Sequence, residues 1–281
     1  MRGVRPPLDG TAAVRYHVAG LGGSADSAPV IVLTYPHAGG EQLSARLARH
    51  PDLACTTGTG ILPMCEQIAA AWRAVDGRPP GPPSQLAETS TRALATSMIT
   101  ALLARQGKRR WCEVAIASPD AAGVFVRLFP GTRVVCLHRS GPDVVQAAVQ
   151  AGSWGLAGPA YASFTSAHPA SGTAALIAYW AARTTALMAF EQEHPGICQR
   201  VRYEDLAGDS LSCLSEFLGL QDPGFRPAAR LHEETAAEAR GAAGPAAEFP
   251  AGPVPPSLLE RANGLMENLG YRSIAEIALG R

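Results

Sequence analysis

The chain has 281 residues and a mass of 29.3 kDa, with 47% hydrophobic and 17% charged residues, enough for one α/β domain with a full core. Its 24 basic and 24 acidic side chains cancel, so it carries no basic field of the kind that attracts nucleic acid or an anionic membrane surface. Lys108 is the single lysine, and any chemistry that needs a lysine must use this residue.

The cysteines and the N-terminal segment indicate a compartment. The six cysteines lie far apart without a CxxC pair, which favours reduced thiols over a disulfide framework or a zinc site. The N-terminal sequence MRGVRPPLDG lacks the apolar core of a signal peptide, and no apolar stretch reaches the ~18 residues of a membrane span. We therefore expect a cytoplasmic protein that binds no metal, nucleic acid or membrane.

The first elements form a strand, a glycine turn and a helix. Residues 1–28 are expected to be an N-terminal extension, in which residues 11–19 alternate weakly like an edge strand. Val30–Tyr35 is a short β-branched run of the kind buried in a parallel sheet. The turn PHAGG follows, and residues 41–50 have helical spacing. This arrangement presents backbone N–H groups to an anion.

The middle of the chain continues the alternation of strands and helices. We expect helices over Ile61–Val75, Gln85–Arg105 and 121–129, and strands over Trp111–Ser118 and Thr132–His138. Alternating strands and helices predict an α/β fold with a parallel sheet, whose ligand crevice lies at the carboxyl ends of the strands. The PHAGG turn and Arg139 would both lie on that edge.

The C-terminal part reads as helices joined by loops. The expected elements are a small-residue loop over 151–170, a helix over Ala174–Glu193, a strand and turn over 198–206, a helix over 211–220, a flexible loop or lid over 240–256, and a last helix over Ser257–Leu269. Gly270 is placed to cap the last helix. We therefore expect residues 29–281 to form a single domain.

Four segments in chain order resemble the sulfotransferase family, whose members transfer a sulfuryl group from 3′-phosphoadenosine 5′-phosphosulfate (PAPS). They cover residues 30–53, 128–145, 201–220 and 258–271. The resemblance implies a three-layer, P-loop-like α/β fold with a central parallel sheet flanked by helices. It also implies PAPS as co-substrate and a small-molecule hydroxyl as acceptor, in specialised metabolism such as antibiotic biosynthesis.

The resemblance assigns the turn after the first strand to the 5′-phosphosulfate. The residues that match this turn are His37, Ala38, Gly39, Gly40, Glu41 and Gln42. His37 stands where the family has a lysine, and Gly40 and Glu41 stand where it has hydroxyls. Glu41 is either a first-turn acid that stabilises the helix or a carboxylate that repels the anion. His37 replaces the lysine when protonated, acts as a base, or is a plain turn residue.

The resemblance assigns Arg139 to the 3′-phosphate, which a guanidinium can bind through two nitrogens. Ala147 replaces the serine that the family places after this arginine. A salt bridge from Arg139 to Asp143 or Glu204 is the alternative. The sequence YEDL matches a late family motif with an architectural role.

A second basic residue belongs to the same expected site. Arg240 and Gly241 match a pair that closes over the 3′-phosphate in the family, so they join the expected cofactor-binding residues.

The sequence leaves open which of several side chains near the strand ends accepts the proton. The candidates are His37, Glu66, Glu113, Asp120 and His168, of which we carry His37 and Glu66 forward as catalytic. Glu113 lies within a strand, where pairing in the core is the alternative, and His168 lies in a loop. We expect residues 61–105 and 151–170 to line a pocket for a modest organic molecule.

Two other functions compete with catalysis by this chain. The first is a catalytically degenerate sulfotransferase-like subunit, because the lysine and both hydroxyls of the turn are missing. It would pair with an active sulfotransferase-like chain; the expected assembly of the protein is a homo-oligomer or such a hetero-oligomer. The second is a thioesterase-like serine hydrolase with Ser153, Asp205 and His232 as triad, although GxSxG is absent.

The P-loop motif GxxxxGK[ST] of nucleotide-binding proteins is also absent. We therefore interpret Lys108 as a surface residue and not as part of a P-loop.

Overall fold

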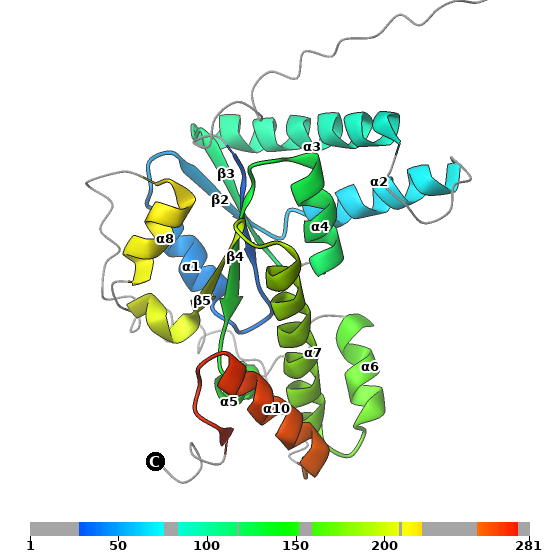
Figure 1. Ribbon diagram of the computed structural model, residues 1–281, viewed down its shortest axis with the longest axis vertical. Coiled ribbons are helices and arrows are strands. Elements are labelled where there is room, and N and C mark those ends of the chain that lie inside the picture. The colour runs from blue at the N-terminus through cyan, green and yellow to red at the C-terminus, as the bar shows by residue number, and fades with distance from the viewer. Residues whose placement is uncertain are drawn as a thin grey trace, which may run out of the picture.

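A five-stranded parallel sheet forms the centre of the protein (Figure 1). The computed structural model describes residues 28–75, 84–116, 118–151, 159–207, 210–220 and 252–274. The strands are β1 (Val30–Leu33), β2 (Leu53–Thr57), β3 (Arg110–Ala115), β4 (Arg133–His138) and β5 (Cys198–Arg202), in the spatial order β2-β3-β1-β4-β5. The predicted α/β fold with a parallel sheet is confirmed.

The central strand β1 is buried along its whole length because neighbours pair with it on both edges and helices cover both faces. Val30 pairs with Cys112 of β3 on one side and with Arg133 of β4 on the other. All four residues of β1 are fully buried. This explains why its sequence VIVL is continuously apolar instead of alternating.

Helices cover the sheet in two layers (Figure 1). One face carries α1 (Gly40–Leu47) and α8 (Ser210–Leu218), whose leucines pack against the valines of β1. The other face carries α2 (Ile61–Val75), α3 (Gln85–Gln106), α4 (Pro119–Leu128), α7 (Gly172–Glu193) and α10 (Pro256–Asn268). These three layers agree with the predicted architecture.

Serines begin four of the helices. Ser84, Ser118, Ser140 and Ser171 precede α3, α4, α5 (Gly141–Gln150) and α7, and each side chain accepts a hydrogen bond from the N–H of the third residue after it. A capping hydroxyl satisfies an N–H group that has no acceptor inside the helix. Gly270 follows the last helix at φ 76°, so its predicted capping role is confirmed.

Two segments of the structure differ from what the sequence predicts. It assigns no strand to Leu53–Thr57, where the structure has β2. It predicts a loop over 151–170, where α6 (Pro159–Ala167) forms and packs on α7. Tyr161 and Phe164 of α6 meet the ring of Tyr179 edge to face, with centroids 5.7 and 5.4 Å apart. These aromatic contacts hold a segment whose small residues alone indicate no helix. The edge strand expected at 11–19 lies outside the described residues, as does the expected loop or lid up to residue 251.

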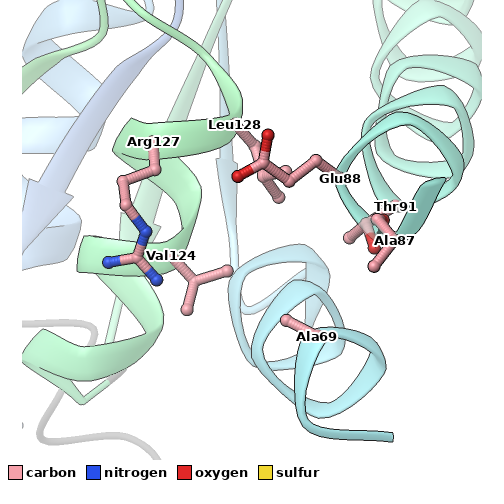
Figure 2. A pocket seen from close by; sticks show the side chains of 7 residues that line it. All are labelled: Ala69, Ala87, Glu88, Thr91, Val124, Arg127 and Leu128. Atoms are coloured by element: carbon pink, nitrogen blue, oxygen red, sulfur yellow. Dashed lines mark hydrogen bonds between the residues drawn. The ribbon is translucent and has the colours of Figure 1, made fainter. Parts of the chain in front are cut away.

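The helices α2, α3 and α4 enclose a small cavity of about 10 Å³ (Figure 2). Glu88 extends from the first turn of α3 toward α4, and Arg127 lies on the far side of the cavity. This space holds about one water molecule, so it is too small for an organic ligand. Among the described residues, no helix has the length and apolarity needed to cross a membrane.

Candidate functional site

The turn between β1 and α1 depends on two glycines. Gly39 has φ 94° and lies against the ring of Tyr203, so a side chain there would overlap that ring. A Cβ on Gly40 would lie 2.8 Å from Val114 Cγ1 and 3.1 Å from Thr34 Cγ2. The backbone of the turn therefore approaches its neighbours more closely than any other residue type permits.

The first turn of α1 offers backbone N–H groups. The first helical hydrogen bond runs from the N–H of Leu43 to the carbonyl of Gly39 at 3.1 Å. The N–H groups of Gly40, Glu41 and Gln42 precede it, so they have no acceptor inside the helix. Such a helix end attracts anions through its donors and its dipole. Glu41 is exposed in the same turn, where its charge competes with an incoming anion.

The backbone of Arg139 is fixed at the end of β4. Its N–H donates to the hydroxyl oxygen of Tyr35 at 3.0 Å, and its carbonyl accepts from that hydroxyl at 3.1 Å. The indole N–H of Trp180 donates to the same carbonyl at 3.0 Å. Tyr35 and Trp180 are both fully buried, so the position of Arg139 is set by the core.

The guanidinium of Arg139 lies beside the glycine turn. Its Nη1 donates to the carbonyl of His37 at 2.9 Å, and its Cζ lies 4.3 Å from the centroid of the Tyr203 ring. Within the described part of the chain, its Nε is buried without a hydrogen-bond partner. The two carboxylates considered as salt-bridge partners of Arg139 bind other groups. Asp143 accepts from the Ser140 hydroxyl, and Glu204 accepts from the backbone N–H of Ser140 and the hydroxyl of Tyr271.

His37 has an unusual backbone and a shifted pKa. Its φ of 63° is the only positive value of a residue other than glycine among the described residues. Burial, followed by the positive charge of Arg139, lowers the pKa of its imidazole below the ordinary value. His37 is therefore neutral at neutral pH, which suits a proton acceptor and opposes the reading in which a protonated imidazole replaces the lysine.

A cavity of about 1200 Å³ opens at the carboxyl edge of the sheet. Residues that follow β1, β2 and β4 and the last residues of β3 border it, together with the start of α2 and the end of α5. The lining includes His37, Gly39, Gly40, Glu41, Gln42, Gly58, Gly60, Leu62, Pro63, Glu113, Val114, Ala115, Ile116, Arg139, Ala147 and Ala151. The crevice therefore forms where parallel α/β sheets bind their ligands.

Glu113 places a buried carboxylate in the wall of this cavity. Glu113 lies on β3, and the residue is 2% exposed. One carboxylate oxygen accepts from the backbone N–H of Thr59 at 2.7 Å and from its hydroxyl at 3.0 Å, and the other is hydrogen-bonded to the hydroxyl of Thr56. Burial raises the pKa of Glu113 against the opposing effect of these hydrogen bonds. The sequence reading missed Thr56 and Thr59 because it assigned no strand there.

The remaining predicted residues that the structure describes do not line the cavity. Ala38 is buried in the core below the turn, and Glu66 lies on α2 beyond Leu62 without lining the cavity. Asp120 is exposed in the first turn of α4, and His168 follows α6. Arg240 and Gly241 lie outside the described residues.

Two competing sequence readings lose their structural basis. A nucleophile elbow must follow a strand, but residues 141–150 form α5 before the Ser153 position, and Asp205 pairs with Arg202 at 2.7 Å. Lys108 donates to the carbonyl of His50 at 2.9 Å and does not line the cavity. No lysine therefore stands among the described cavity residues.

Comparisons with known proteins identify the family of the chain. The family model described as "Sulfotransferase family" matches residues 29–223. The structure resembles that of the mouse sulfotransferase SULT7A1 complexed with PAP, with 15% sequence identity, coverage of 92% of this chain and 89% of that one, and a TM-score of 0.44. It also resembles sulfotransferase STF1 from Mycobacterium tuberculosis H37Rv, with 14% identity, 76% coverage of each chain and a TM-score of 0.41. No curated protein matches the sequence. Because the family model covers more than half of its residues, the chain belongs to the sulfotransferase family.

Proposed function

We propose that the protein transfers a sulfuryl group from PAPS to a hydroxyl of a small-molecule acceptor in the cytoplasm. The observation that carries this proposal is that the N-terminus of α1 and the guanidinium of Arg139 border the same cavity of about 1200 Å³. This volume accommodates a nucleotide together with a modest acceptor.

The residues present fit such a donor at two points. The N–H groups of Gly40, Glu41 and Gln42 would hold the 5′-phosphosulfate, as helix N-termini hold phosphates. Arg139 would hold the 3′-phosphate, and its Nε, which is buried without a partner among the described residues, gains an acceptor on binding. Glu41 is the one residue of the turn that opposes the donor by its charge.

PAPS supplies an electrophilic sulfur with PAP as leaving group. The acceptor oxygen forms the new S–O bond as the bond to the phosphate breaks, and the imidazole of His37 takes the hydroxyl proton. The lowered pKa of His37 keeps its imidazole unprotonated at neutral pH, so the ring can accept this proton. The N–H groups of α1 stabilise the charge that develops on the leaving oxygen.

Two features favour the degenerate subunit. Glu41 occupies a hydroxyl position of the family's turn, and the cavity residues that are described include no lysine. Under this reading, the chain binds PAP weakly or not at all and acts through a partner.

Calorimetric titration with PAP decides between the two functions. We expect measurable binding, and Arg139→Ala should weaken it by about 1.5 to 3 kcal/mol, the scale of a hydrogen bond to a charged group. Arg105→Ala is the control, because it removes a positive charge from an exposed site at the end of α3. Absence of heat, together with co-purification of a second sulfotransferase-like chain, would favour the subunit.

A further inference from the structure

Glu113 is a buried carboxylate that no cation neutralises among the described residues. Within the described part of the chain, its hydrogen-bond partners are two threonine hydroxyls and one backbone N–H. Burying a carboxylate without a cation is unfavourable, which the raised pKa of the group reflects. A purely structural anchor for Thr56 and Thr59 would avoid this cost if it were a glutamine.

A glutamine would satisfy the same neighbours. The Thr56 hydroxyl accepts from the indole N–H of Trp111 at 2.8 Å and reaches the carbonyl of Cys112 at 3.1 Å. It can therefore donate to that carbonyl and accept from an amide NH₂ at position 113, while the amide oxygen accepts from Thr59. The local hydrogen bonds thus permit an amide here, and the negative charge calls for another explanation.

Among the described residues that line the cavity, carboxylates outnumber guanidinium groups. Apart from the phenol of Tyr35, the ionisable lining of the cavity consists of Glu41 and Glu113 against Arg139 and His37, and burial lowers the pKa of His37. Arg139 is directed to the His37 carbonyl and the Tyr203 ring. Among the described residues that line the cavity, no side chain places a positive charge beside Glu113, and a cationic ligand would supply one.

Apolar side chains share this cavity with Glu113. Leu62 and Pro63 at the start of α2 and Ala115 and Ile116 at the end of β3 line the same cavity. Ile116 is 54% exposed. A ligand here would cover hydrocarbon with its body and present its charge to Glu113.

We propose that the acceptor is an amine-bearing hydroxyl compound, whose ammonium group pairs with Glu113 while its apolar body packs on Leu62 and Ile116. This inference rests on the proposed transfer to a hydroxyl. It adds that the acceptor supplies a positive charge that the described lining of the cavity lacks beside Glu113. The ion pair forms in a buried wall, where charged hydrogen bonds are stronger than at the surface.

The test compares two probes of the same shape. Tyramine carries a phenolic hydroxyl and an ammonium, and para-propylphenol replaces the ammonium with a methyl group. Binding to the full chain is measured by ligand-observed NMR without PAP. We expect tyramine to bind about tenfold tighter or more, and Glu113→Gln to remove this preference while para-propylphenol binding stays unchanged.

Two further measurements make the result specific. Glu193→Gln, at the exposed end of α7, should keep the tyramine preference. Thermal unfolding of Glu113→Gln should show a folded protein, as the hydrogen-bond pattern predicts. Equal binding of the two probes, no binding of tyramine, or a preference that survives Glu113→Gln would overturn the proposal.

PAP calorimetry separates this inference from the proposed function. Glu113→Gln should leave PAP affinity unchanged or slightly tighter, since it removes a negative charge from the cavity. A chain that prefers tyramine but gives no heat with PAP would keep the amine site and lose the transferase function. The reverse pattern would keep the transferase function and reject the amine site.

Discussion

At the scale of single residues, His37 gives the sharpest test of chemistry. His37→Gln should lower the rate of sulfuryl transfer by about 10²-fold or more, the usual contribution of a general base, while PAP affinity changes little. Because burial and Arg139 lower the pKa of His37, the neutral form persists to more acidic pH than for an ordinary histidine. The rate of the wild type should therefore stay level from neutral pH to below ~6.5 and fall only as pH passes the lowered pKa.

A pH-rate profile on the wild type and His37→Gln checks both statements. A wild-type rate that declines already at the ordinary histidine pKa, or a variant with full activity, would remove His37 from the mechanism.

At the scale of elements, Glu41 opposes the use of the α1 N-terminus as an anion site. Glu41→Gln should tighten PAP binding, most clearly at low ionic strength, because a charge that competes for the helix end is removed. The same change should destabilise the fold by about 0.3 to 1 kcal/mol through the lost helix-dipole interaction.

Glu88→Gln is the matched control for this change. Glu88 is the first-turn acid of α3 and lines only the small cavity of Figure 2. Its variant should show a similar loss of stability without any change in PAP affinity. Weaker PAP binding by Glu41→Gln would mean that the carboxylate does not face the donor.

The elements also show what the sequence could predict. The apolar run of β1 and the glycines after it were sufficient to place the turn, because burial on both faces and close backbone approach leave strong signals. Strand β2 was missed because LACTT carries neither clear alternation nor a long apolar run. The hydrogen bonds from Thr56 and Thr59 to Glu113 were missed with it, since they exist only once β2 lies beside β3. Arg139 was found, but its stacking on Tyr203 joins residues 64 positions apart and has no local signal.

At the scale of the whole molecule, the buried charge of Glu113 connects stability with function. The folded pKa of Glu113 is raised, chiefly by burial, so the fold favours the protonated form. By linkage, this carboxyl lowers the free energy of unfolding at pH above its raised pKa, and the penalty vanishes below the pKa of the unfolded chain. Sites that retain such a penalty are candidates for ligand recognition.

Glu113→Gln should therefore raise Tm at neutral pH. The gain should shrink as the pH falls toward and below the ordinary glutamate pKa, where the wild-type side chain is protonated in both states. Thermal unfolding of the two proteins over this range measures the difference directly, and Glu193→Gln should show no comparable gain at any pH because its side chain is exposed. A lower Tm for Glu113→Gln at neutral pH would show that the carboxylate stabilises the β2–α2 loop as a structural anchor. In that case the negative charge would no longer point to a cationic ligand.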